Sequence, residues 1–210
     1  MKALILVDLQ NDFMPGGAMP VPHGHDVIPL ANRLQGRFKF VVATQEWRPT
    51  SHRSFAENYE DRKPGDVVVV RKEPRTLLPL FCVQNTRGAE LAPGLMLNRV
   101  NKVIRKGTDP EVDSYSGFFD AGHINASGLS DYLRDKRVTE VFILGLATES
   151  TVKHTALDAV GLGFKTRVIE DACRGLNRSP DDVSTAIAEM KEAGVRFVSS
   201  KQILKAPSKA

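Results

Sequence analysis

The sequence predicts a single α/β domain of three layers, in which helices cover both faces of a mainly parallel sheet of about six strands. Short apolar runs typical of buried strands recur along the 210 residues, and helical patterns separate most of them. An alternation of strand and helix gives a parallel sheet that is covered on both faces. The length suits one domain with a sizeable core.

The expected elements follow from these patterns. Apolar runs predict strands at residues 3–7, 38–43, 102–105, 141–144, 164–169 and 195–198. Helical patterns cover residues 26–34, 129–136, 181–193 and 202–205. A further helix is expected from Ser150, because Val152, Ala156, Ala159 and Val160 recur at three- and four-residue spacing.

The expected domain covers residues 1–206. Residues 57–76 are charged and contain proline, and they predict a long surface excursion with one edge strand at Val67–Val70. Residues 164–169 are expected to lead into a loop at residues 170–175. The last four residues, 207–210, are expected to be frayed.

Composition excludes several functional classes. The net charge is only +4 and basic residues are scattered, so no nucleic-acid surface is expected. No apolar run approaches about 18 residues, so no membrane span is expected. The apolar start of the chain is too short for a signal peptide. Cys82 and Cys173 predict free thiols in a reducing, cytoplasmic setting.

Polar residues stand where several strands end. Asp8 follows the first strand and Lys106 follows the third, at the edge where α/β enzymes keep catalytic groups. The amides of Ser150, Thr151 and Val152 are expected at a helix N-terminus, where an oxyanion can be stabilised. Alternatively, Asp8 and its polar neighbours only turn and cap the chain.

Residues 145–158, Gly-Leu-Ala-Thr-Glu-Ser-Thr-Val-Lys-His-Thr-Ala-Leu-Asp, resemble the nucleophile turn of the nicotinamidases, in the isochorismatase-like cysteine hydrolase superfamily. The family pattern is Gly-Leu-Ala-Thr-Asp-Tyr-Cys-Val-Lys-His-Thr-Ala-Leu-Asp. Thr151 therefore stands at the position of the nucleophilic cysteine. The resemblance covers nearly the whole chain apart from the middle excursion.

The resemblance implies roles for residues elsewhere. Residues 8–13 resemble the Asp-x-Gln-Asn-Asp-Phe opening of the family, so Asp8 would be the general base. Lys106 would pair with that base, and Thr151 would occupy the nucleophile position. The residues implied around the substrate ring are Phe13, Leu78, Tyr115, Leu146 and Ala147, with Leu78 in place of a family tryptophan.

The family binds a divalent metal, which contacts the pyridine nitrogen of the substrate, and here its ligand positions are altered. Residues 44–55 resemble Thr-Gln-Asp-Trp-His-Pro-x-x-His-x-Ser-Phe, but Glu46 and Arg48 replace the metal-binding Asp and His. In residues 77–91 Phe81 replaces another metal-binding His. Arginine has no lone pair to donate, so we expect no metal and interpret the retained His52 as structural.

The favoured hypothesis is a nicotinamidase homologue that has lost amidase activity and now binds a ligand or partner. Its expected ligand is a small aromatic amide or carboxylate, without any cofactor. A second hypothesis is an altered hydrolase of a small cyclic amide or anionic substrate that uses Asp8 and Lys106 without a cysteine, as isochorismatases do. A third is a structural or homo-oligomeric role with a collapsed pocket.

Two roles are open for Arg48. It could pair with Glu46 and fill the place of the metal, with Phe81 packed on its apolar side, because a buried cation needs a partner. Alternatively, it could leave a guanidinium edge free for a carboxylate ligand in bidentate geometry.

Overall fold

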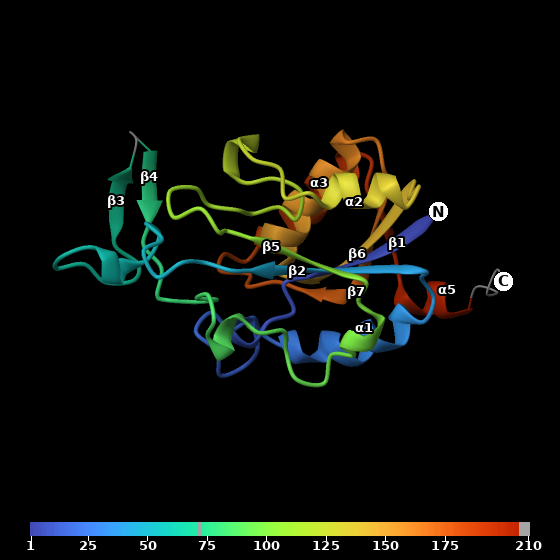
Figure 1. Cartoon of the computed structure of the whole chain (residues 1–210), viewed down its shortest axis with the longest axis horizontal. Helices are drawn as coiled ribbons and strands as arrows, with labels where there is room; N and C mark the ends of the chain where they lie inside the picture. The colour runs from blue at the N-terminus through green and yellow to red at the C-terminus, as the bar shows by residue number, and fades with distance from the viewer. Residues whose placement is uncertain (71–72, 206–210) are drawn as a thin grey trace.

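The computed structural model describes residues 1–70 and 73–205 and confirms the predicted α/β fold (Figure 1). Six strands form one sheet in the order β5-β2-β1-β6-β7-β8. All five neighbouring pairs in this sheet are parallel. The strands are β1 (Lys2–Val7), β2 (Phe40–Glu46), β5 (Lys102–Lys106), β6 (Glu140–Leu146), β7 (Lys165–Arg174) and β8 (Arg196–Val198).

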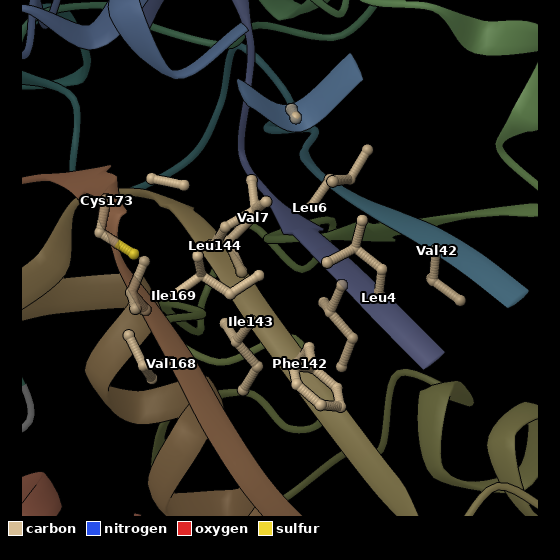
Figure 2. Packing of buried hydrophobic residues seen from close by; sticks show 14 of the residues in the cluster. Leu4, Leu6, Val7, Val42, Phe142, Ile143, Leu144, Val168, Ile169 and Cys173 are labelled. Carbon is tan, nitrogen blue, oxygen red and sulfur yellow. The ribbon is translucent and has the colours of Figure 1, made fainter. Parts of the chain in front are cut away.

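The centre of the sheet is the hydrophobic core. Strands β1 and β6 pair along their whole length, with Leu4 opposite Phe142 and Leu6 opposite Leu144. These side chains are buried on one face of the sheet, and Ile5 and Ile143 are buried on the other. Figure 2 shows this core packed with residues of β2 and β7. Continuous apolar runs are required here, because a parallel strand inside an α/β protein meets helices on both sides.

Helices form the two outer layers. Helices α1 (Val27–Gln35) and α5 (Ser200–Lys205) lie together on one face. Helices α2 (Leu129–Asp135) and α3 (Lys153–Gly161) lie on the other face (Figure 1), and α4 (Asp182–Glu192) packs against α3. Among the described residues no helix is long and apolar enough to cross a membrane.

The excursion differs from its prediction. Val67–Val70 is not an edge strand of the main sheet; it is strand β3, which pairs antiparallel with β4 (Glu73–Thr76) in a separate two-stranded sheet. Figure 1 shows this hairpin projecting beyond the carboxyl ends of the main strands. Apolar composition predicted the first strand, but Glu-Pro-Arg-Thr has too little strand character to reveal its partner.

Two boundaries also need correction. Strand β7 does not end at Ile169: after a register shift opposite Ile143 and Gly145, it pairs again through Cys173 and Arg174. The polar Glu170 and Asp171 sit at this irregularity, which made the segment resemble a loop. Helix α3 begins at Lys153, because residues Thr148–Val152 form a wider π-helical turn, η7. The predicted tail at residues 207–210 lies outside the described residues.

Candidate functional site

Three neighbouring strand ends bring acidic and basic side chains together. Asp8 follows β1, while Glu46 ends β2 and Lys106 ends β5. These strands are adjacent and parallel, and Glu46 and Lys106 are directly opposite in the β2–β5 register. Carboxyl ends of parallel strands share one edge of the sheet, so the topology alone places these three residues at one corner.

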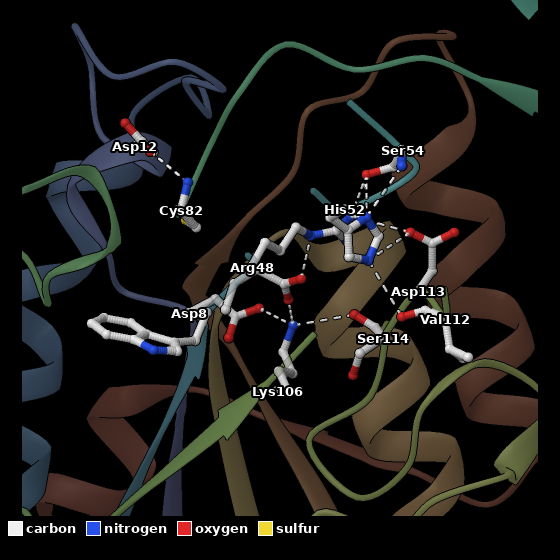
Figure 3. Close-up of polar contacts among 12 residues, drawn as sticks. Asp8, Asp12, Arg48, His52, Ser54, Cys82, Lys106, Val112, Asp113 and Ser114 are labelled. Carbon is white, nitrogen blue, oxygen red and sulfur yellow. Dashed lines mark hydrogen bonds and ion pairs between the residues drawn. The ribbon is translucent and has the colours of Figure 1, made fainter. Parts of the chain in front are cut away.

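Lys106 lies between two carboxylates in this corner. Its Nζ is 2.9 Å from Asp8 Oδ2, and it also contacts Glu46 Oε2 and the Ser114 carbonyl oxygen (Figure 3). The Asp8 side chain accepts a 2.6 Å hydrogen bond from the Thr44 hydroxyl on its other oxygen. Asp8, Glu46 and Lys106 are each at most 3% exposed, so these contacts act where water screens little.

Burial and neighbouring charges shift the pKa values of Asp8, Glu46 and Lys106 in different directions. Burial raises the pKa of Asp8, and the attraction of Lys106 only partly opposes this. Burial alone would raise the pKa of Glu46, but Lys106 and Arg48 together hold that pKa below its usual value. For Lys106 burial acts to lower the pKa, yet Asp8 and Glu46 outweigh it and the pKa is raised. Glu46 therefore stays ionised, whereas Asp8 holds its proton more readily.

Arg48 continues the network beyond Glu46. Its Nε donates to Glu46 Oε1 at 2.6 Å, and its Nη1 donates to Ser54 Oγ at 2.6 Å and Asp113 Oδ1 at 3.1 Å. The Phe81 ring lies under the guanidinium, with the Arg48 Cζ atom 4.7 Å from the ring centroid. The predicted Arg48–Glu46 pair, with Phe81 on its apolar side, is thus confirmed.

His52 is a buried, neutral member of this network. Its Nδ1 lies 2.8 Å from Ser54 Oγ and 3.2 Å from Arg48 Nη1, while its Nε2 faces the Val112 carbonyl oxygen at 3.4 Å. Nδ1 therefore accepts and Nε2 carries the proton. Burial, helped by the charge of Arg48, lowers the pKa of His52 to about 4.

A cavity of about 610 Å³ opens beside the network. Its apolar wall includes Phe13, Leu78, Phe81 and Leu146, and the Phe13 and Phe81 rings lie 5.8 Å apart. Its polar wall includes Glu46, Arg48, Ser150 and Thr151. Tyr115 and Ala147 also line it, so the cavity contains every residue proposed for the substrate ring.

Asp8 and Lys106 do not form part of that wall. They lie behind Glu46 and Ser114, which do face the cavity. The structure thus brings Asp8 and Lys106 together, and it places Thr151 on the cavity that Glu46 also lines.

The comparisons identify the family. A model of the isochorismatase domain matches residues 2–202. The chain belongs to the isochorismatase-domain family. A nicotinamidase from Escherichia coli strain K12 is 46% identical over 199 residues, which are 92% of each chain. A nicotinamidase from Acinetobacter baylyi is 40% identical and covers 96% of this chain and 94% of its own.

Solved structures agree with this placement among the nicotinamidases. The Acinetobacter baumanii nicotinamidase superposes with a TM-score of 0.90 at 40% identity, covering 96% of this chain and 97% of that one. The yeast nicotinamidase, bound to the inhibitor nicotinaldehyde, gives a TM-score of 0.87 at 32% identity over 95% and 100% of the two chains.

The residues present do not suit the divalent metal that the family implies. Arg48 has no lone pair, and Phe81 has no donor atom. The Glu46 carboxylate is already held by Arg48 and Lys106, and His52 Nδ1 by its two neighbours. Among the described residues no three His, Cys, Asp or Glu side chains are grouped to hold a metal ion.

The predicted oxyanion site needs correction for two of its three amides, those of Ser150 and Val152. The amides of Ser150 and Val152 both donate to the Ala147 carbonyl oxygen at 3.1 Å, so they are not free for a ligand. The cause is the π-helical turn at Thr148–Val152, which folds this segment back before the α-helix begins. By contrast, the Ser150 and Thr151 hydroxyls make no hydrogen bond with any described residue.

Sequence reasoning missed the outer part of the network. Asp113 lies in a loop, and its second oxygen pairs with Arg75 of the hairpin strand β4. Both residues line the cavity. Neither belongs to a recognisable motif, and only the fold brings residues 38 positions apart into contact. With Arg75 and Asp113 included, the network contains three acidic residues (Asp8, Glu46, Asp113) and three basic ones (Arg48, Arg75, Lys106).

Proposed function

We propose that this nicotinamidase-family protein binds a small aromatic amide or carboxylate in its cavity but does not hydrolyse amides. The observation that carries the proposal is Thr151, which lines the cavity at the position of the family's nucleophilic cysteine. A nearby cation or a helix N-terminus can bring a cysteine into its thiolate form. A threonine hydroxyl ionises far less readily and needs a dedicated base within reach.

The position of the expected base supports the same proposal. Asp8 is 1% exposed, does not line the cavity, and has one oxygen on Thr44 and the other on Lys106. A general base must reach the proton it removes, directly or through one water molecule. Lys106 likewise contacts Asp8 and Glu46, so Asp8 and Lys106, the two residues retained from the family pattern, pair with each other and not with a ligand in the cavity.

The altered metal-ligand positions also support a protein without amidase activity. In this proposal Arg48 takes the place of the metal, and the protein works without a cofactor. A relative from Arabidopsis thaliana, 28% identical over 199 residues, is described as a probable inactive nicotinamidase. We place the protein in the cytoplasm, since Cys82 and Cys173 are free and buried.

Specific observations favour a second candidate, an altered hydrolase. Asp8 has a raised pKa, as acid–base residues often do, and the Ser150 and Thr151 hydroxyls face the cavity without a partner among the described residues. Its weakness is the separation of Asp8 and Lys106 from the cavity wall. The third hypothesis, a collapsed pocket, is disfavoured because Leu78 and Phe81 line an open cavity instead of plugging it.

The test combines turnover and binding on the purified full-length protein. We expect no ammonia from nicotinamide, with or without added zinc, manganese or iron, while calorimetry detects nicotinamide binding. The 46% identical Escherichia coli nicotinamidase is the positive control for the ammonia assay. Ammonia release that survives purification and disappears in Asp8→Asn would overturn the proposal in favour of the altered hydrolase.

A further inference from the structure

Strand β5, at one edge of the main sheet, is only partly covered. A parallel sheet is normally enclosed by helices on both faces. Among the described residues, however, β5 makes extensive contact with no element except its neighbour β2. Its side chains alternate between the faces: Ile104 and Lys106 are buried, whereas Val103 and Arg105 are exposed. One face of the sheet is therefore open at this edge.

An open groove lies on this face. It is lined by residues of β2, of β5 and of the segment that precedes β5, including Gln45, Trp47, Glu90, Leu97, Val103 and Arg105. Gln45 and Arg105 are direct neighbours in the β2–β5 register. No residue of the groove lines the ligand cavity, so the two are separate features of the surface.

The groove exposes the kinds of side chain that proteins use at interfaces. Leu97 is 52% exposed and Val103 is 39% exposed. The Arg105 guanidinium lies over the Trp47 ring, with its Cζ atom 3.9 Å from the ring centroid. Tryptophan and arginine are enriched at interfaces and are frequent among the residues that contribute most of the binding energy. The groove therefore has the composition of a protein-binding surface.

Two opposite charges in the groove have no counter-ion. The Glu90 carboxylate makes no hydrogen bond or ion pair with any described residue. Arg105 Nε donates to the Gln45 side chain at 3.3 Å, but Arg105 forms no ion pair with a described residue. Glu90 and Arg105 thus line one groove without pairing with each other.

This distribution of charge suits a second copy of the same chain. In a twofold-symmetric dimer every contact occurs twice, so both members of each contact must lie on the same surface patch. A twofold axis through the groove would bring Glu90 of each copy to Arg105 of the other. Leu97 and Val103 would then lose their exposure to water between the two ion pairs.

We propose that the groove is the interface of a homodimer in which Glu90 of each copy pairs with Arg105 of the other. Leu97 and Val103 supply the apolar part of this interface, and Trp47 holds the arginine in position. The inference goes beyond the proposed function and does not depend on it, because the ligand cavity shares no residue with the groove.

The first test uses the native full-length protein. Analytical ultracentrifugation at increasing protein concentration should show a change from the mass of one chain to twice that mass. Amide hydrogen exchange in residues 102–106 should slow as the dimer forms, while exchange in the exposed helix α4 stays the same. A single-chain mass at every concentration would overturn the proposal.

The second test reverses the two charges separately. Glu90→Arg and Arg105→Glu each place like charges in both contacts, so either variant alone should raise the dissociation constant of the dimer about tenfold or more. An equimolar mixture of the two variants should form a heterodimer, because both contacts then join opposite charges. Glu192→Arg is the matched control, since Glu192 lies on α4 outside the groove, and it should dimerise like the native protein.

The outcomes are distinct. A dimer that persists unchanged in both single reversals would place the interface elsewhere and overturn the proposal. A mixture of the two folded variants that forms no heterodimer would refute the pairing of Glu90 with Arg105. If a charge variant does not fold, Leu97→Asp replaces it, and a folded Leu97→Asp variant that still dimerises would overturn the proposal. Nicotinamide calorimetry on the monomeric variants tests the proposed function separately from the dimer.

Discussion

Arg48 Nε lies 2.6 Å from Glu46 Oε1, and both side chains are almost completely buried. The other oxygen of the same carboxylate contacts Lys106, so Glu46 joins two cations that belong to different segments. Gly107 leaves room for this arrangement, because a Cβ there would collide with the Glu46 carboxylate. Glu46, which is one methylene longer than the aspartate of the family pattern, thus reaches Lys106 on the neighbouring strand β5.

We predict that Glu46→Gln destabilises the fold by about 3–5 kcal/mol, because it leaves two buried cations without their shared carboxylate. Urea unfolding followed by circular dichroism measures the loss. The matched control is Glu189→Gln, which breaks an exposed pair with Lys153 and should cost about 0–1 kcal/mol. Similar losses in the two variants would show that the buried network contributes no more than a surface ion pair.

We predict that Thr151→Cys alone does not restore nicotinamide hydrolysis. The new thiol would stand on the cavity wall, while Asp8 is not part of that wall and Arg48 still stands at a position where the family pattern has a metal-binding histidine. Combining Thr151→Cys with Glu46→Asp, Arg48→His and Phe81→His restores the family pattern and should produce stoichiometric zinc binding. Metal analysis and ammonia release are the two readouts. Ammonia from the single Thr151→Cys variant would refute this prediction.

His52 should make the protein less stable as the pH falls from 6.5 towards 4. Its pKa is about 4 in the folded protein and about 6.5 in the unfolded chain, so the unfolded chain binds more protons within this window. Stability must then fall with pH, by roughly 3 kcal/mol over the full window. Asp8, with its raised pKa, acts in the opposite direction, because the folded form binds the extra proton.

The His52 contribution can be separated with His52→Asn. Urea midpoints of the two proteins are compared at pH 7 and pH 5, where Asp8 contributes equally to both. The native protein should lose more stability than the variant between these values. A parallel decline in both would remove His52 as the cause.

Arg75 should hold the hairpin to the network. We predict that Arg75→Ala costs about 1 kcal/mol, because the arginine is one-quarter exposed and Asp113 keeps its contact with Arg48. Amide hydrogen exchange should rise in residues 67–70 and 73–76 and stay unchanged in the central strand β6. Unchanged exchange in the hairpin would show that other contacts hold it.

The arrangement of the sheet was predictable because periodicity and apolar runs carry it. The runs at residues 3–7 and 141–144 became neighbouring central strands, and the predicted Arg48–Glu46 pair formed because the two residues lie on one side of an extended segment. Topology also explains the meeting of Asp8 and Lys106. Each of these predictions depends on backbone position, which local sequence largely determines.

The sequence could not predict which of several possible partners each charged side chain would contact. Glu46 had Arg48 two residues away, and nothing local indicated that Lys106, 60 positions later, would share its carboxylate. The pairing of Arg75 with Asp113 depends on where a hairpin outside the main sheet comes to lie. The π-helical turn was missed because its residues read equally well as the first turn of an α-helix.

The mutual burial of Asp8 and Lys106 gives this pair a reason to persist that has nothing to do with turnover. If Lys106 were lost, the buried Asp8 would lose its cationic partner, and if Asp8 were lost, Lys106 would keep only one of its two carboxylates. Folding alone would therefore select against losing them, whether or not the protein catalyses a reaction. When members of this family are sorted into active and inactive, an intact acid–lysine pair is a weak indicator, and the residue at the nucleophile position carries more information.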